Sequence, residues 1–334
     1  MQYRPLGTTG VSVSSLAMGT MAFGPDRQVD RAVFGRCREA GVNVFDCADV
    51  YNQGAAEVSL GELVHGCRDE VVLTTKAYFP SGGGVNDRGS SRYHLVRAVE
   101  ASLDRLRTDR IDLFFLHRFD DRTDLASTLR AVDDLVRQGK VLYLGLSNFA
   151  AWQAQKALGV AALHGLDPAV ALQPMYNLAK RQAESEILPM AASEGLAVFP
   201  YSPLGGGLLA GRYGREERPD DGRLVTNGMY ATRYGAESNF ALAEAFRARA
   251  AERGVHPVTL AVAWVASHPA VTAPLLGARS VAQLEPALAA ADLVLGPEER
   301  ASLSALSAAP APATDRNEEG SSSDYSATLT GGRR

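Results

Sequence analysis

The sequence of 334 residues has few cysteines, little surplus charge and no long apolar run. Its three cysteines, Cys37, Cys47 and Cys67, are odd in number and form no CxxC pair, so we expect reduced thiols in a cytoplasmic protein. The N-terminus lacks an apolar core of signal-peptide length, and no uninterrupted apolar run approaches the roughly 18 residues that span a bilayer. We therefore expect no export by that route and no membrane partner.

The charge balance and the histidine spacing exclude two further classes of function. Lysine and arginine number 34, and aspartate and glutamate number 38, which gives a net charge of −4. Without a basic surplus, nucleic acid is not expected as a primary partner. The histidines show no HxxxH or similar spacing, so no metal site is expected. The hydrophobic fraction of 46% is ordinary for a globular chain that buries a large core.

Short apolar runs alternate along the chain with segments whose apolar residues recur every three to four positions. This alternation is typical of repeated strand–helix units. Continuously apolar runs such as residues 113–116 favour parallel strands covered by helices. Leu125, Leu129 and Val132 keep helical spacing, and Gly139 stands where a helix C-terminus favours a left-handed residue. Strands are predicted at residues 16–20, 42–46, 71–76, 111–117, 141–148, 170–177, 196–202 and 271–278.

Eight such units either close into a (β/α)8 TIM barrel or stay open as a doubly wound sheet, and length alone also permits two lobes. Because no linker interrupts the middle of the chain, we predict a single α/β barrel domain over residues 1–307, in which a short β-hairpin at residues 3–14 comes before the first strand–helix unit. Residues 203–239 form an unusually long connection, which predicts a lid among long loops on the C-terminal face. Residues 308–334 are poor in large apolar side chains and are predicted to be a flexible tail.

Polar side chains end the predicted strands, at the barrel face where active groups gather. Asp46 ends the second strand and Tyr51 follows it, Lys76 ends the third, and His117 ends the fourth. A nearby ammonium is expected to lower the pKa of a tyrosine from its usual value near 10. Each residue alone could have a structural role, such as an Asp46–Lys76 ion pair. Together they predict a group that protonates the alkoxide formed when hydride reaches a carbonyl.

Several longer motifs resemble the aldo-keto reductase family, in the order in which that family has them, across roughly residues 2–305. The segments are residues 43–51 (NVFDCADVY), 75–76 (TK), 115–118 (FLHR), 145–149 (GLSNF), 173–177 (QPMYN), 201–204 (YSPL) and 277–280 (GARS) with Gln283. The resemblance implies a TIM-barrel carbonyl reductase that uses NADPH/NADP+, with Asp46, Tyr51, Lys76 and His117 as catalytic residues. The cofactor contacts that it implies are Gly19, Thr20, Met21, Asp46, Ser147, Asn148, Gln173, Tyr201, Ser202, Leu204, Gly206, Arg212, Gly277, Arg279, Ser280 and Gln283.

The resemblance also divides the cofactor residues by role. Ser147, Asn148 and Gln173 are implied to hold the nicotinamide amide, and Tyr201 to stack on the nicotinamide ring. Arg279 and Ser280 are implied to meet the 2′-phosphate, a task suited to guanidinium geometry.

Two shorter matches point to other dehydrogenase classes. Residues 204–210 (LGGGLLA) fit a glycine-rich dinucleotide turn, but they occur late in the chain. Residues 176–180 (YNLAK) fit a Y-x-x-x-K centre, which needs a glycine-rich turn after the first strand, and residues 19–24 are not one. We predict neither.

The competing function is a cofactor-sensing binding module, because potassium-channel β-subunits share the fold and resemble residues 88–94. For the enzyme, the composition suggests a high-GC bacterial source and a small-molecule carbonyl substrate, a keto-sugar or natural-product intermediate of secondary metabolism. The sequence is compatible with a homo-oligomer but does not indicate one.

Overall fold

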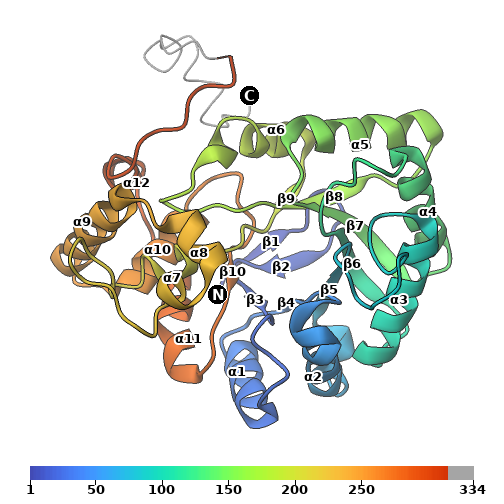
Figure 1. The fold of residues 1–334 in the computed structure, drawn as a ribbon, viewed down its shortest axis with the longest axis horizontal. Coiled ribbons are helices and arrows are strands. Elements are labelled where there is room, and N and C mark those ends of the chain that lie inside the picture. The colour runs from blue at the N-terminus through green and yellow to red at the C-terminus, as the bar shows by residue number, and fades with distance from the viewer. Residues whose placement is uncertain (315–334) are drawn as a thin grey trace.

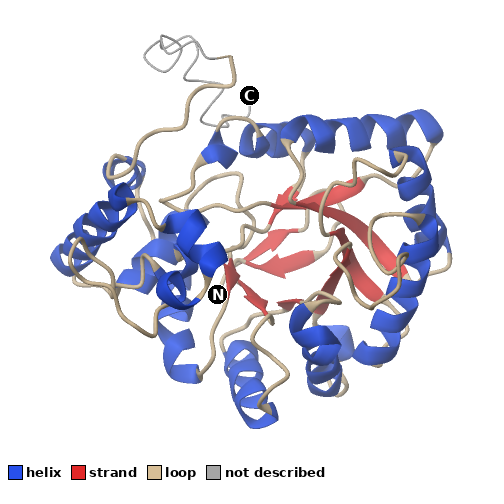
Figure 2. Cartoon of the chain, in the orientation of Figure 1, coloured by secondary structure: helices blue, strands red, loops and turns tan. Residues whose placement is uncertain are grey.

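The computed structural model describes residues 1–314 of the chain. Eight parallel strands curl into a barrel, and helices surround them on the outside (Figure 1; Figure 2). The predicted TIM barrel is confirmed, as is the antiparallel hairpin of β1 (Tyr3–Pro5) and β2 (Ser12–Ser14). The barrel strands are β3 (Ala17–Gly19), β4 (Val44–Asp46), β5 (Val72–Ala77), β6 (Ile111–Leu116), β7 (Val141–Ser147), β8 (Ala169–Gln173), β9 (Ala197–Val198) and β10 (Leu275–Leu276).

All strands of the barrel are parallel, so their carboxyl ends lie at one edge. Strand order follows chain order around the barrel. The order is β10-β3-β4-β5-β6-β7-β8-β9, and a backbone hydrogen bond from Leu275 to Pro200 (2.8 Å) joins the last strand to the region after β9. The strands are shorter than predicted at 170–177, 196–202 and 271–278. Each of these segments contains a proline, Pro174, Pro200 or Pro274, which has no N–H to donate to a neighbouring strand.

The helices form the outer layer of the fold. Apolar side chains at helical spacing, including Leu129, Val132 and Leu135, face the sheet, and Gly139 has the expected left-handed backbone (φ 73°). The helices are α1 (Arg27–Glu39), α2 (Ala55–Val64), α3 (Arg92–Leu106), α4 (Leu125–Arg137), α5 (Ala151–His164), α6 (Ile187–Glu194), α7 (Arg223–Thr226), α8 (Gly228–Tyr234), α9 (Glu237–Arg253), α10 (Pro257–Ala266), α11 (Val281–Leu288) and α12 (Pro297–Ser304).

Two apolar cores hold the barrel together, one between helices and sheet and one inside the sheet. Val44, Leu113 and Phe115 belong to the inner core. Gly145 on β7 makes room for the Phe115 ring, because a Cβ at this position would lie 2.4 Å from it. The inner core fills the barrel, so a ligand has access only at its ends.

The long connection at residues 203–239 carries the short helices α7 and α8 and a small apolar cluster of its own. Tyr213, Tyr230, Tyr234 and Phe240 are buried in this cluster. Residues 308–314 of the predicted tail form no helix or strand, and Ser185 donates a hydrogen bond to the Ala311 carbonyl (2.8 Å). The remainder of the predicted tail lies outside the described residues. No helix within residues 1–314 is both long enough and apolar enough to cross a bilayer.

Candidate active site

A buried ion pair lies at the carboxyl ends of β4 and β5. Lys76 is 0% exposed, and its Nζ donates to Asp46 Oδ2 and to the Cys47 carbonyl, both at 2.6 Å. Asp46 Oδ1 accepts from Thr74 Oγ1 (2.6 Å) and Gln173 Nε2 (2.9 Å). Burial alone would lower the pKa of Lys76, but the adjacent Asp46 carboxylate raises the pKa above its usual value. Lys76 is therefore an ammonium at neutral pH.

Tyr51 lies beside this ion pair, where the chain leaves β4 and begins a short 3-10 turn. Its hydroxyl is 3.5 Å from Lys76 Nζ, and the Nζ lies 5.0 Å from the centre of the Tyr51 ring. The expected lowering of the tyrosine pKa is wrong as a net direction in this structure. Burial raises the pKa of Tyr51, and Lys76 opposes this rise without overcoming it. The hydroxyl therefore keeps its proton at neutral pH and can donate it to a base that forms beside it.

His117 follows β6 and is 8% exposed. Its ring stands edge-on to Phe79 and Tyr51, with centroid distances of 4.9 and 6.1 Å. Burial, aided by Lys76, lowers the pKa of His117 to about 3, so the imidazole is neutral. Its Nδ1 is buried and has no hydrogen-bond partner among the described residues. The His117 ring lines the cavity beside Tyr51, and a neutral imidazole can donate one hydrogen bond to a ligand oxygen.

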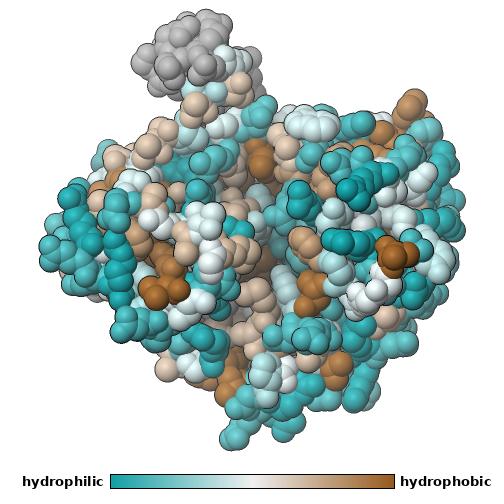
Figure 3. All heavy atoms as spheres, in the orientation of Figure 1, coloured by the Kyte–Doolittle hydropathy of each residue, from teal (hydrophilic) through white to brown (hydrophobic). Residues whose placement is uncertain are grey.

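Asp46, Tyr51 and His117 face a cavity of about 1020 Å³ at the carboxyl edge of the barrel. Figure 3 shows the hollow at the centre of this face. The cavity brings together most of the predicted site, and the predicted residues on its wall are Gly19, Met21, Asp46, Tyr51, His117, Ser147, Asn148, Gln173, Tyr201, Ser202, Leu204, Gly206, Arg212, Gly277, Arg279 and Gln283.

Lys76, Thr20 and Ser280 are predicted site residues that do not line the cavity. Lys76 lies behind Tyr51. Thr20 is fully buried and donates to the Asp46 carbonyl at 3.0 Å, so it supports the ion pair. Ser280 caps helix α11, where its Oγ accepts from the backbone of Gln283 at 3.2 Å. These positions place all three behind or beside the cavity wall.

One end of the cavity presents amide and hydroxyl groups. Asn148 Nδ2 donates to Ser147 Oγ (3.1 Å), and the Tyr201 hydroxyl donates to Asn148 Oδ1 (2.7 Å). Asn148 and Ser202 adopt left-handed backbone conformations, with φ of 56° and 57°. Such conformations are uncommon for residues other than glycine and concentrate at functional sites.

The chemistry of the cavity wall fits a dinucleotide. At Gly207 and Gly277 no atom lies within 4 Å of where a Cβ would stand, so their backbone is open to close approach. Tyr201 presents an aromatic ring at the amide end, and Arg279 lies on the same cavity wall. Arg212, a predicted cofactor contact, is bound to Asp221 within the long connection.

Several residues of the cavity wall escaped prediction. Phe79, Met229, Tyr230 and Arg233 line it, and three of these belong to the long connection. Arg118 also lines it and belongs to the FLHR motif, which is the signal that could have drawn attention to it. The connection has no periodicity from which the orientation of its side chains could be predicted.

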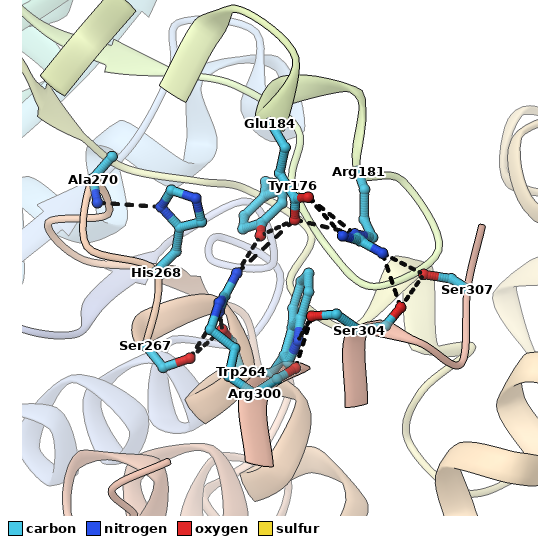
Figure 4. Close-up of polar contacts among 10 residues, drawn as sticks. All are labelled: Tyr176, Arg181, Glu184, Trp264, Ser267, His268, Ala270, Arg300, Ser304 and Ser307. Atoms are coloured by element: carbon cyan, nitrogen blue, oxygen red, sulfur yellow. Dashed lines mark hydrogen bonds and ion pairs between the residues drawn. The ribbon is translucent and has the colours of Figure 1, made fainter. Parts of the chain in front are cut away.

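The structure also explains the Y-x-x-x-K match. Tyr176 is fully buried and does not line the cavity. Its hydroxyl donates to Glu184 (2.6 Å) and accepts from Arg300 (2.7 Å), in a polar network that includes Trp264 (Figure 4). Tyr176 therefore binds α12 to the segment after β8. The described residues contain no group of three or more His, Cys, Asp or Glu side chains suited to a metal ion.

A parallel barrel with ionisable side chains gathered at its carboxyl edge defines a TIM-barrel enzyme, and comparison with known proteins gives its class. Residues 15–308 match the model of the Aldo/keto reductase family. The chain belongs to this family and is an oxidoreductase.

Its relatives carry names of several kinds. A probable voltage-gated potassium channel subunit beta of Arabidopsis thaliana is 34% identical, covering 88% of this chain and 92% of the relative. The uncharacterized oxidoreductase YrpG of Bacillus subtilis is 38% identical, covering 89% and 93%. The versiconal hemiacetal acetate reductase of Aspergillus parasiticus is 29% identical, covering 90% and 95%.

Proposed function

We propose that the protein is an NADPH-dependent carbonyl reductase in which Tyr51 is the general acid. One observation carries the proposal: the Tyr51 hydroxyl lies 3.5 Å from a fully buried lysine ammonium and faces the cavity beside His117. A protonated phenol next to a fixed positive charge is suited to give its proton to a forming alkoxide.

In the proposed reaction, each of four residues has a separate role in the reduction of the carbonyl group. When bound, the reduced nicotinamide supplies a hydride to the carbonyl carbon. Tyr51 gives its proton to the carbonyl oxygen, so that an alcohol forms, and the Lys76 ammonium stabilises the phenolate that remains. Asp46 keeps Lys76 charged and in place. His117, which is neutral, holds the carbonyl oxygen by a hydrogen bond.

The cofactor is proposed to lie along the cavity wall. Ser147, Asn148 and Gln173 hold the nicotinamide carboxamide, and Tyr201 packs on the ring. Arg279 binds the 2′-phosphate of the adenosine ribose, because a guanidinium matches phosphate geometry with paired hydrogen bonds. This last contact makes NADPH, and not NADH, the proposed cofactor.

The proposed substrate is a small ketone or aldehyde in the cytoplasm, with keto-sugars and natural-product intermediates as the classes to test first. Two relatives carry names of this kind, versiconal hemiacetal acetate reductase and norsolorinic acid reductase. Other relatives are named as potassium-channel β-subunits, which is the competing assignment. Oxidation of NADPH by a generic aldehyde supports the enzyme, and a purified protein that binds NADPH without turnover supports a sensor.

The test compares Tyr51→Phe with the wild type for both NADPH affinity and turnover. Turnover should be lost while NADPH still binds, since only the proton donor is removed. The matched control is Tyr93→Phe, because Tyr93 is an exposed tyrosine on α3 outside the cavity. Unchanged turnover in Tyr51→Phe contradicts the proposal. Arg279→Ala tests the cofactor and should weaken NADPH by about 1.5–3 kcal/mol while NADH binding changes little.

A further inference from the structure

The cavity wall carries more positive charge than its own carboxylates neutralise, although the whole chain has a net charge of −4. Within residues 1–314, the carboxylates on the wall are Asp46 and Asp221. Each already has a partner, because Asp46 binds Lys76 and Asp221 binds Arg212. The arginines on the wall are Arg118, Arg212, Arg223, Arg233 and Arg279. A cavity with this balance attracts anions.

Two of these arginines differ from the other half-buried arginines of the protein. Within the described residues, the side chains of Arg223 and Arg233 alone among them form no hydrogen bond and no ion pair, whereas that of Arg300, for example, donates to the Tyr176 hydroxyl (2.7 Å; Figure 4). Both guanidinium groups lie near the ring of Tyr230, at 5.6 and 5.7 Å from its centre. A guanidinium on a cavity wall whose donors have no acceptor in the protein can offer them to an anionic ligand.

Although both arginines lie beside Tyr230, we assign them to different ligands. Arg223 follows closely on Asp221, whose carboxylate binds Arg212 and is also affected by the charge of Arg279. Arg223 is therefore grouped with the arginines available to the phosphates of the cofactor. Arg233 lines the same cavity as Tyr201, and its positive charge opposes the rise that burial causes in the pKa of Tyr201, so we assign Arg233 to the Tyr201 end of the cavity.

Arg118 is a second cation at the catalytic end. It directly follows His117 in the chain, and its side chain lines the same cavity. It is exposed, and it forms no ion pair or side-chain hydrogen bond within residues 1–314. After Arg212, Arg223 and Arg279 are assigned to the cofactor, Arg118 and Arg233 remain without a counterion.

We propose that Arg233 and Arg118 form a subsite for an oxyanion on the carbonyl substrate, a carboxylate or a phosphate. The subsite rests on the proposed reductase function and narrows its substrate to anionic aldehydes and ketones. The planar guanidinium fork binds either group through paired, charge-assisted hydrogen bonds. A site built to bind such a group discriminates strongly against an analogue that lacks it, because the donors are then left unpaired.

The test compares pairs of carbonyl compounds in which one member carries an anionic group and the other is neutral. The carboxylate arm uses 4-formylbenzoate against its methyl ester, and the phosphate arm uses glyceraldehyde 3-phosphate against glyceraldehyde. In the wild type, kcat/KM should favour the anionic member of at least one pair. Arg233→Gln and Arg118→Gln should each lower the anionic-to-neutral ratio about tenfold, or ~1.4 kcal/mol. The matched control is Arg122→Gln, because Arg122 is an exposed arginine of the same loop that does not line the cavity.

Binding measurements separate this subsite from the reductase function itself. Benzoate, which has no reducible carbonyl, should bind the NADP+ complex more tightly than benzamide in the wild type and lose this advantage in Arg233→Gln. If benzoate binds in this way but no aldehyde is turned over, the reductase proposal fails and the subsite stands. If aldehydes are reduced without preference for charge, the subsite is overturned. It is also overturned if Arg233→Gln weakens NADPH as much as Arg279→Ala does, because Arg233 then belongs to the cofactor.

Discussion

Replacing Asp46 by asparagine should destabilise the fold by about 3–5 kcal/mol, the range found when one partner of a buried ion pair is removed. Lys76 is 0% exposed and has two acceptors, Asp46 Oδ2 and the Cys47 carbonyl, both at 2.6 Å. In Asp46→Asn no carboxylate balances the ammonium, and only the Cys47 carbonyl still accepts a hydrogen bond from it. The asparagine oxygen can still accept from Thr74 and Gln173, so the loss comes mainly from the charge.

The assay is urea unfolding at pH 7 without cofactor, since a ligand that binds only the native state would add its own stabilisation. The double variant Asp46→Asn/Lys76→Met should recover much of the loss, because it leaves no buried charge. Asp134→Asn is the matched control: its partner Arg92 is exposed, and such surface pairs contribute roughly 0–1 kcal/mol. A loss below about 1 kcal/mol in Asp46→Asn, or a double variant less stable than the single one, would refute the reasoning.

Three further predictions concern the apo protein. Asp49 is 3% exposed, and its oxygens have no partner among the described residues. Burial raises the pKa of Asp49 to about 7, so the folded state holds a proton that the unfolded state releases near pH 4. The free energy of unfolding of the wild type should therefore fall as pH rises from about 4 to about 7, by up to about 4 kcal/mol. In urea titrations Asp49→Asn should gain more over the wild type at pH 8 than at pH 5, and an equal gap would contradict this. Gly61→Ala should lower the free energy of unfolding by about 1–3 kcal/mol, because the new Cβ would lie 2.5 Å from the Leu106 carbonyl oxygen. Gly159→Ala, where no atom lies within 4 Å of the new Cβ, should raise the free energy of unfolding by about 0.5–1 kcal/mol. Equal melting temperatures of the two variants would contradict both expectations. With a pKa of about 3, His117 should show no NMR titration between pH 5 and 8, where an ordinary imidazole would.

The sequence was sufficient to predict the barrel and the polar residues at its carboxyl edge, because both depend on local patterns. Continuous apolar runs place the strands, and a polar residue directly after such a run lies at the carboxyl edge, as Asp46 and His117 do. The later strands are shorter than their apolar runs, because prolines within these runs cannot donate a hydrogen bond to a neighbouring strand. Pro200, for example, falls inside the predicted strand at residues 196–202.

Properties that depend on the whole environment of a side chain could not be predicted. The pKa of Tyr51 depends on the balance of burial against Lys76, and sequence shows only that the lysine exists. The partner of Arg212 is Asp221, nine positions away in an irregular segment with no periodicity to bring the two together. That Arg223 and Arg233 have no counterion within residues 1–314 is likewise visible only once the neighbouring carboxylates of that part of the chain are placed.

Residues 173–177, at the end of β8, connect the ion pair, the long connection at residues 203–239 and helix α12. Gln173 donates to Asp46 (2.9 Å), and Tyr176 binds Arg300 on α12 (2.7 Å). Asn177 Nδ2 donates to the Ser202 carbonyl (2.9 Å) and to the Tyr234 hydroxyl on α8 (3.0 Å). Gln173 and Asn177 therefore attach the buried ion pair and α8 to the same short segment. Tyr176, between them, is fully buried, binds α12 through Arg300 and does not line the cavity, so the Y-x-x-x-K match at this position reflects packing.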